Sequence, residues 1–278
     1  MIEGAQRDST PTTAEPRSAI VLAGRRSPED PLARAAGATH RALLDIEGEP
    51  MLLRVVRQLL ARPSIERLLI NIDAPELLAD YEELEALRSR GQVELLRSTD
   101  SPSESVLESL EWAGLERGPT LVTTADHALL DDPILDAFID GSERLEADLT
   151  VGLVSRETIV ARFPEAKRTY LRFRDDAFSG ANLFLFRTPA AAGAARFWRR
   201  VEKERKRPWR IAKAFGPITL LLFVTRRLTL DAALDRASGI IGARVRAVPL
   251  DIAEAAVDVD KIEDLELVRR ILAERRCR

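Results

Sequence analysis

Short apolar runs alternate with amphipathic segments along most of the chain. Residues 18–23 (SAIVLA) are apolar almost without a break, which is typical of a strand buried on both faces. Residues 50–61 instead place apolar side chains at helical spacing, and Pro50 opens them at a first-turn position. The same patterns predict strands at residues 18–23, 67–73, 92–97, 120–124, 148–154, 181–186, 244–250 and 255–259, and helices at residues 50–61, 75–89, 102–113 and 262–275.

Capping residues mark two of the helix starts. Ser101 and Glu104 form a capping-box pattern, and Asp132, followed by Pro133, is predicted to cap the helix that follows the strand at residues 120–124. Strands that alternate with helices at these spacings predict an α/β sandwich with a mostly parallel sheet.

The alternation stops between residues 189 and 242. This stretch is helical in pattern, strongly basic in its first half and apolar in its second. We interpret residues 18–278 as a single domain, with residues 189–242 as a helical insertion or subdomain. Residues 1–17 are polar and rich in Pro and Thr, which predicts a disordered N-terminal tail.

The composition is that of a globular protein. Of 278 residues, 45% are hydrophobic and 31% are charged, which excludes a disordered protein and a small disulfide-stapled one. Cys277 is the one cysteine and only two histidines are present, which argues against a structural zinc site and for a reducing compartment. The net charge of −3 gives no general attraction to nucleic acid.

The apolar stretches give no sign of membrane insertion. The longest, at residues 218–224, is far shorter than the roughly 20 residues that span a bilayer. The N-terminus has no basic segment followed by an apolar one. We therefore expect a cytoplasmic protein without a transmembrane segment.

A long loop follows the first predicted strand, from Gly24 to Glu49. Ligands of open α/β sheets bind beyond the carboxyl ends of the strands, and a loop of this length is usually functional. Gly24 would let backbone amides approach a phosphate. The basic side chains around it are Arg25, Arg26, Arg34 and Arg41. The alternative is a solvated surface loop whose arginines pair with Glu29, Asp30 and Asp45.

Asp126 lies at the tip of the strand predicted at residues 120–124. A carboxylate there would face substrate phosphates, and Mg²⁺ prefers one or two carboxylates together with phosphate oxygens and water. The alternative role is capping of the next helix, which Asp132 fills better. We interpret His127, beside it, as a loop-packing residue rather than a catalytic base.

Asp258 and Asp260 alternate in a segment predicted as a strand, so both carboxylates would face the same side and suit a second metal contact. The alternative for Asp260 is a capping box with Glu263 at the start of the last helix.

Residues 196–210 form a basic stretch. It suits an acceptor-phosphate site, for which we single out Arg207 and Arg210, or a contact with a membrane surface. The alternative is a solvated helix face, because Glu202 and Glu204 interleave with the basic residues.

Four motifs follow one another along the chain. The frame LAG, basic loop, ALLDIEGEPML spans residues 22–52, and TTADHALL, SGANLFLF and VDVDKIEDLELVRRIL stand at residues 123–130, 179–186 and 257–272. In this order they resemble the phosphate loop, the metal-binding strand end, the strand that contacts nucleotide or acceptor, and the final motif of the MobA-like NTP transferases, nucleotidyltransferases of the nucleotide-diphosphosugar transferase superfamily.

The resemblance implies a Rossmann-like three-layer α/β/α sandwich with a mostly parallel mixed sheet and, in this chain, a helical basic insertion. It implies a Mg²⁺-dependent enzyme, with Mn²⁺ as a substitute, that transfers NMP from an NTP to a phosphorylated acceptor and releases pyrophosphate. Catalytic roles fall on Arg41 and Asp126, and metal ligation falls on Asp126, Asp258 and Asp260. Nucleotide contacts fall on Leu22, Ala23, Gly24, Arg25, Arg26, Ser103 and Ser105. Acceptor contacts fall on Gly180 and Asn182, beside Arg207 and Arg210.

Two features of the resemblance have alternatives. Arg25 stands in place of a second glycine, and the family's lysine falls at or near Arg41, which is bulkier than lysine at a phosphate site. Both a divergent active branch and an enzyme with impaired catalysis fit this departure. For Ser103 and Ser105 the alternative to a base contact is helix capping, which Ser101 already explains.

Two other functions stay open at this stage, a glycosyltransferase of the related GT-A fold and a non-catalytic nucleotide-binding protein. Pyrophosphate release would separate a nucleotidyltransferase from both. The expected partners are an NTP and a phosphorylated small-molecule or lipid-linked acceptor, the latter with a peripheral membrane contact, and no nucleic acid. The sequence specifies neither the base of the NTP nor the oligomeric state.

Overall fold

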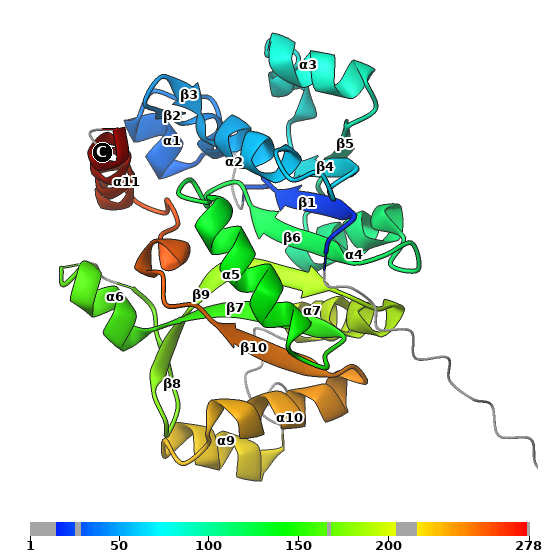
Figure 1. Ribbon diagram of the computed structural model, residues 1–278, viewed down its shortest axis with the longest axis vertical. Coiled ribbons are helices and arrows are strands. Elements are labelled where there is room, and N and C mark those ends of the chain that lie inside the picture. Colours follow the sequence, from blue (N-terminus) through cyan, green and yellow to red (C-terminus); the bar gives the residue numbers. More distant parts are fainter. Residues whose placement is uncertain (1–14, 26–28, 166–167, 204–215, 277–278) are drawn as a thin grey trace, which may run out of the picture.

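A mixed β-sheet forms the centre of the protein. The computed structural model describes residues 15–25, 29–165, 168–203 and 216–276. The strands of the sheet run in the order β10-β7-β9-β6-β1-β4-β5, with β8 paired to β9 (Figure 1). Their bounds are β1 Ser18–Leu22, β4 Arg67–Ile72, β5 Val93–Arg97, β6 Thr120–Thr124, β7 Leu149–Ser155, β8 Leu171–Arg172, β9 Ala177–Phe186 and β10 Val245–Pro249. Within this sheet β9 is antiparallel to its neighbours and the other described pairs are parallel, which confirms a mostly parallel mixed sheet.

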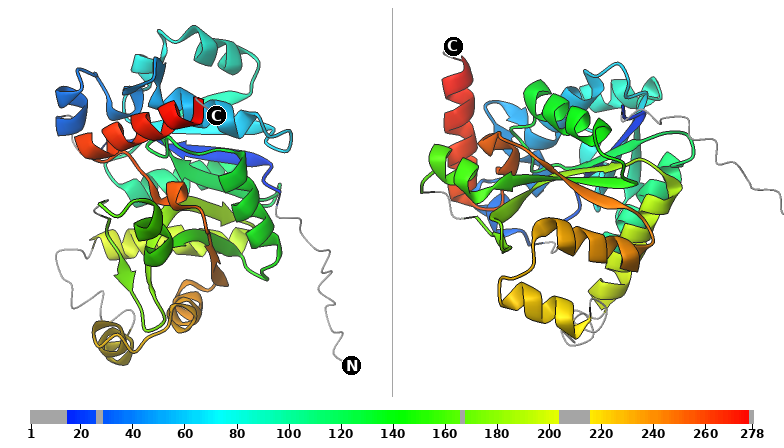
Figure 2. Two further views of the ribbon diagram at one scale, coloured as in Figure 1. Left: turned by 60° about the vertical axis from the view of Figure 1, so that its left-hand side comes forward. Right: turned by 60° about the horizontal axis from the view of Figure 1, so that its bottom comes forward.

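Helices cover both faces of the sheet, which confirms the three-layer sandwich (Figures 1 and 2). Along β1, Ala19 and Val21 enter one core and Ile20 enters the other, as the two-residue period of a strand requires. The first core is shared with α2 (Met51–Leu60), α3 (Glu82–Ser89), α5 (Asp132–Glu143) and α6 (Arg156–Arg162). The second is shared with α4 (Pro102–Ala113), α7 (Ala192–Lys203) and α10 (Leu230–Ile241).

A third core lies beside the sheet, under the C-terminal helix α11 (Ile262–Arg276). It joins α11 to helix α1 (Pro31–Ala35), to the hairpin of β2 (Asp45–Ile46) and β3 (Glu49–Pro50), and to the loop after β6. Leu32, Ile46, Leu129 and Leu265 are all at most 5% exposed there. This core therefore fixes three segments that are far apart in sequence and that all contribute to the site described below.

The strand predicted at residues 255–259 is wrong. After Leu250, whose N–H donates to the Leu153 oxygen (2.8 Å), the chain leaves the sheet and forms a 3-10 turn, η4 (Ala253–Ala256). Val257 and Val259 alternate with polar residues because both are buried in the third core, not because they belong to a ladder. A period of two can therefore arise from packing against a helix.

Two helix predictions also need correction. The helix predicted at residues 75–89 is split into a 3-10 turn, η2 (Pro75–Leu78), and α3. The cap of α5 is Asp131, whose carboxylate accepts from the N–H of Ile134 (3.1 Å), and Asp132 is the first helical residue.

The stretch from residue 189 to 242 contains the 3-10 turn η3 (Pro189–Ala191), α7, α9 (Pro217–Val224) and α10 among its described residues. α9 keeps apolar side chains at the surface: Ile218 is 70% exposed and Val224 69%. Phe223 packs edge-on against Phe173, with 5.8 Å between ring centroids. In the part of the chain that the structure describes, no helix has the length and apolar character needed to cross a membrane.

Candidate active site

The carboxyl ends of three neighbouring strands meet at one edge of the sheet. β4 and β6 both pair with β1 in parallel, so the residues that follow the three strands lie side by side. The Ala23 N–H donates to the Asn71 oxygen (2.8 Å), and the Ala125 N–H donates to the Leu22 oxygen (2.9 Å). These bonds hold the start of the long loop between the ends of β4 and β6.

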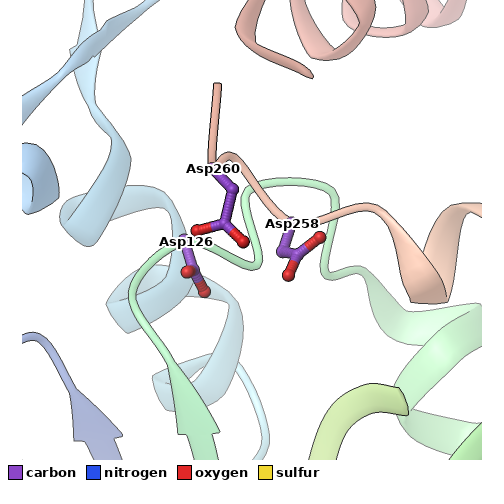
Figure 3. A group of neighbouring side chains, drawn as sticks. All are labelled: Asp126, Asp258 and Asp260. Carbon is purple, nitrogen blue, oxygen red and sulfur yellow. The ribbon is translucent and has the colours of Figure 1, made fainter. Parts of the chain in front are cut away.

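Three carboxylates converge just beyond β6 (Figure 3). Asp126 follows β6, whereas Asp258 and Asp260 come from the segment between η4 and α11, and one carboxylate oxygen of each lies within 4.8 Å of the others. The backbone N–H of Val259 donates to the backbone carbonyl oxygen of Asp126 (3.1 Å), which ties the two segments directly. The structure thus brings the three predicted acidic residues together without the strand that was expected to align two of them.

The electrostatics of this acidic group leave its negative charge only partly compensated. Burial raises the pKa of Asp126 to about 6; Asp258 and Asp260 add to the rise, while a hydrogen bond from the Thr124 hydroxyl and the charge of Arg41 oppose it. Burial and the charge of Asp260 also raise the pKa of Asp258. Carboxylates with raised pKa values in close contact are a favourable place for a cation.

Arg41 lies on one side of the acidic group. Its Nη1 is 2.8 Å from Asp260 Oδ1, and its Nε is 2.8 Å from Asp30 Oδ2. Asp30 also caps α1 by accepting from the N–H groups of Leu32 and Ala33. The pairing of a loop arginine with Asp30 matches the alternative interpretation of the loop, but the same guanidinium reaches the acidic group.

Arg168 lies on the other side, and sequence reasoning missed it. Its guanidinium contacts Asp258 and, through Nη2 at 3.0 Å, Asp264 Oδ1. The side chain is only 8% exposed. No periodicity or motif marks the residues around Arg168, so the buried contact itself is the only signal that could have found it.

Asp264 replaces the expected cap of α11. Its Oδ2 accepts from the N–H groups of Asp260 (3.2 Å) and Lys261 (3.0 Å), so the carboxylate that reaches back is Asp264 rather than Glu263. The expected capping box is therefore wrong. Asp260 is left to contact Arg41 and the acidic group, with 53% of its side chain exposed.

The loop after β1 brings Leu22, Ala23, Gly24 and Arg25 to the same edge. Gly24 is exposed, and a Cβ there would lie 3.0 Å from the Ser98 hydroxyl, so a larger residue would crowd the end of β5. Arg25 donates to Asp73 from its backbone N–H (3.1 Å) and its Nε (2.8 Å). Arg26 lies outside the described residues.

Ser103 and Ser105 lie in the first turn of α4, at the end of β5, and both are buried. The Ser103 hydroxyl donates to Glu202 of α7, and the Ser105 hydroxyl accepts from the N–H of Thr99 (2.8 Å). Both side chains therefore have partners inside the protein, and a base contact at these serines stays a prediction.

Gly180 and Asn182 lie where β9 separates from β6. The β6–β9 pairing reaches only Val122 and Phe184, and the β7–β9 register shifts over the same residues. Asn182 has a φ of 50°, in the left-handed region that non-glycine residues rarely adopt. Such irregularities occur beside active sites, where they redirect side chains. Arg207 and Arg210 lie outside the described residues.

His127 is buried inside the loop after β6. Its exposed fraction is 1%, and burial lowers its pKa to about 4. The ring is therefore neutral and enclosed, which fits a loop-packing role.

Comparison with known proteins gives a match to one family model and to several solved structures. The model of the MobA-like NTP transferase domain matches residues 19–243, which include Asp126 and end before Asp258. A structure from Thermus thermophilus, described as a hypothetical transferase, is 32% identical with a TM-score of 0.73, covering 90% of this chain and 99% of that one. No curated protein matches the chain.

Two more distant solved structures share the fold. CMP:2-keto-3-deoxy-manno-octonic acid synthetase complexed with CTP is 15% identical with a TM-score of 0.54, covering 93% of this chain and 98% of that one. 4-Diphosphocytidyl-2C-methyl-D-erythritol synthase from Anaerococcus prevotii is 9% identical with a TM-score of 0.54, covering 94% of this chain and 97% of that one. At these identities the likeness concerns the fold.

Proposed function

Because the chain belongs to the MobA-like NTP transferase family, whose members are nucleotidyltransferases, we propose that it transfers NMP from an NTP to a phosphorylated acceptor and releases pyrophosphate. The observation that carries the proposal is the convergence of Asp126, Asp258 and Asp260 at the carboxyl edge of the sheet, in contact with Arg41. Nucleotidyl transfer needs positioning and charge neutralisation more than a protein nucleophile.

The acidic group suits a divalent cation, Mg²⁺ or Mn²⁺. Three carboxylates offer the hard oxygen ligands that these ions prefer, and the pKa of Asp126 is raised first by burial and then by the neighbouring charges of Asp258 and Asp260. A bound cation would neutralise charge on the α-phosphate and on the leaving pyrophosphate. Asp126, Asp258 and Asp260 would hold it, and Arg168 would keep Asp258 in place.

The remaining predicted residues have separate tasks in this proposal. Arg41 attracts the phosphates and can exchange its present contact with Asp260 for a phosphate oxygen. The backbone of Leu22, Ala23 and Gly24 lines the phosphate side. Ser103 and Ser105 shape the loop at the nucleotide side, and Gly180 and Asn182 face the acceptor side at the irregular part of β9.

The basic stretch is proposed to contact the acceptor phosphate. Helix α7 ends its described part at Lys203, and Glu202 bonds to Ser103 at the start of α4, which is on the carboxyl edge of the sheet. Arg207 and Arg210 follow a few residues later in the sequence. We expect Arg207→Ala and Arg210→Ala to raise the acceptor KM while NTP affinity stays unchanged. Equal effects on both substrates, or none, would assign the stretch to a solvated helix face.

The test begins with binding. Thermal shifts with each of the four NTPs, and with NDP-sugars, with and without Mg²⁺, identify the nucleotide. Pyrophosphate release is then measured with the stabilising NTP and a set of sugar phosphates, polyol phosphates and lipid phosphates. We expect Mg²⁺-dependent release with one acceptor class. Binding of NDP-sugars without NTPs would favour the glycosyltransferase, and NTP binding without release for any acceptor would favour a non-catalytic binding protein.

A further inference from the structure

Three side chains meet over the end of β4, outside the acidic group. Asp73 follows β4 directly, Arg25 comes from the start of the loop after β1, and His40 comes from further along the same loop. Arg25 donates its N–H to Asp73 Oδ1 (3.1 Å) and its Nε–H to Oδ2 (2.8 Å). His40 Nε2 lies 3.0 Å from Asp73 Oδ1. One carboxylate therefore receives donors from two separate parts of the loop.

The hydrogen bonds determine the tautomer of His40. Its Nδ1 accepts from the Ala42 N–H (3.1 Å) and so carries no proton, which leaves the ring proton on Nε2 for donation to Asp73. His40 is fully buried, so turning the ring would break both bonds inside the protein. Although burial alone would raise it, the donors from His40 and Arg25 hold the pKa of Asp73 below its usual range.

Arg25 also crosses the loop. Its Nη1 lies 3.4 Å from the Thr39 oxygen, next to His40. His40 in turn precedes Arg41, which reaches Asp30 and Asp260. The contacts thus form a continuous connection from the end of β4, through two parts of the loop, to the acidic group.

We propose that Asp73 is a positioning residue that clamps this loop, through Arg25 and His40, in the arrangement that binds NTP phosphates. The inference rests on the proposed function and adds the device that holds its phosphate loop. Arg25 stands where the family pattern has a glycine. Its side chain is held by Asp73 and Thr39, so it fixes the loop instead of contacting a phosphate.

The clamp raises the affinity for NTP by lowering the entropy that the loop loses when the nucleotide binds. A long loop that is already held loses little further conformational freedom when the nucleotide binds. Breaking the clamp removes no group that contacts phosphate, yet it weakens every phosphate contact that the loop makes. The affinity loss is therefore larger for a triphosphate than for a monophosphate, which a general loss of stability would not produce.

The test is calorimetric titration of the full chain, in Mg²⁺, with the best-binding NTP and with the matching NMP. The variants are Asp73→Asn, Arg25→Ala and the double variant. Asp80→Asn is the matched control, because it makes the same change at an exposed carboxylate further along the same segment. Arg25→Ala leaves the buried His40–Asp73 bond in place and decides the question if Asp73→Asn does not fold.

We expect each single clamp variant to weaken NTP affinity about tenfold while NMP affinity changes less than about twofold. The double variant is no weaker than Asp73→Asn, because both changes break the same contact. Equal weakening of NTP and NMP, additive effects, or unchanged NTP affinity would overturn the clamp and leave the proposed function standing. Absence of any NTP binding to the unchanged protein would overturn the proposed function, and the clamp with it.

Discussion

Two carboxylates on either side of β1 have opposite surroundings. Asp73, at the end of β4, receives donors from Arg25 and His40, and its pKa is held below the usual range. Asp126, at the end of β6, is partly buried beside Asp258 and Asp260, and its pKa is raised to about 6. A carboxylate whose charge is met by protein donors organises structure, whereas one buried among like charges needs a cation from outside. The position of a carboxylate at the end of a strand therefore does not by itself show whether it has a structural or a cation-binding role.

Removing the charge of Asp126 is expected to have the largest effect. Asp126→Asn keeps the shape of the side chain but loses the anionic ligand, so Mg²⁺-dependent pyrophosphate release should fall by about two orders of magnitude or more. The protein should stay folded, because the substitution removes a partly buried charge that lies beside two other carboxylates. Asp140→Asn, an exposed carboxylate on α5, is the matched control. A folded Asp126→Asn variant with unchanged release would contradict the assignment.

Arg41→Ala is expected to weaken NTP binding next most strongly. Loss of a charge-assisted phosphate contact costs roughly 1.5–3 kcal/mol, which corresponds to about ten- to a hundredfold in Kd. Part of this loss is offset, because Arg41 no longer has to leave Asp30 and Asp260. Titration calorimetry of Arg41→Ala and the unchanged protein with the NTP measures the change in Kd. An unchanged Kd would mean that another arginine holds the phosphates.

The two carboxylates should also differ in their response to acid. Because the pKa of Asp126 is raised in the folded protein, protonation of this carboxylate favours folding. Its contribution to the free energy of unfolding is present in acid and is lost as the pH rises through about 6. The pKa of Asp73 is lowered, so its contribution is present near neutrality and is lost only in stronger acid.

Cation affinity follows from this difference. Because a cation must displace the proton of Asp126, Mn²⁺ affinity should fall by up to about tenfold for each pH unit below 6. Titrations with Mn²⁺ in the presence of the NTP, from pH 8 to pH 5, measure the change in Mn²⁺ affinity. The same titrations of Asp126→Asn show how much of the change comes from protonation of the nucleotide. Identical pH slopes for the two proteins would show that Asp126 does not control the site.

The smallest expected effect separates Asp260 from Asp264. Asp264→Ala removes the acceptor of two backbone N–H groups at the start of α11 and also the partner of Arg168 Nη2, so it should lower the free energy of unfolding by about 1 kcal/mol or more. Asp260→Asn should leave stability nearly unchanged and reduce Mg²⁺-dependent turnover instead. Thermal unfolding and pyrophosphate release measure the two effects. The reverse pattern would make Asp260 the cap and Asp264 the functional residue.

Much of the fold could be predicted from the sequence because buried strands and amphipathic helices leave periodic patterns. β1 and α4 begin where the apolar run and the Ser101 cap predict them. The segment at residues 255–259 shows the limit, since its alternation comes from packing in the third core. Asp126, Asp258 and Asp260 could be singled out together because motif order marked them, although the predicted strand was wrong.

The rest of the site could not be predicted, for a physical reason. The clamp joins Arg25, His40 and Asp73 from three segments, and no spacing along the chain encodes those contacts. Arg168 is likewise recognisable only from its buried contact with Asp258. Polar networks of this kind depend on tertiary contacts, so they become visible only when the strand ends are brought together.

Direct measurement of Mn²⁺ binding tests the contrast between the two carboxylates most clearly. Electron paramagnetic resonance counts free and bound Mn²⁺ for the unchanged protein, Asp126→Asn and Asp73→Asn, each at saturating NTP. We predict that Asp126→Asn weakens Mn²⁺ binding at least about tenfold, whereas Asp73→Asn leaves it within about twofold once the nucleotide is bound. Equal Mn²⁺ affinity in the unchanged protein and in Asp126→Asn would contradict the claim that Asp126 is the cation-binding carboxylate.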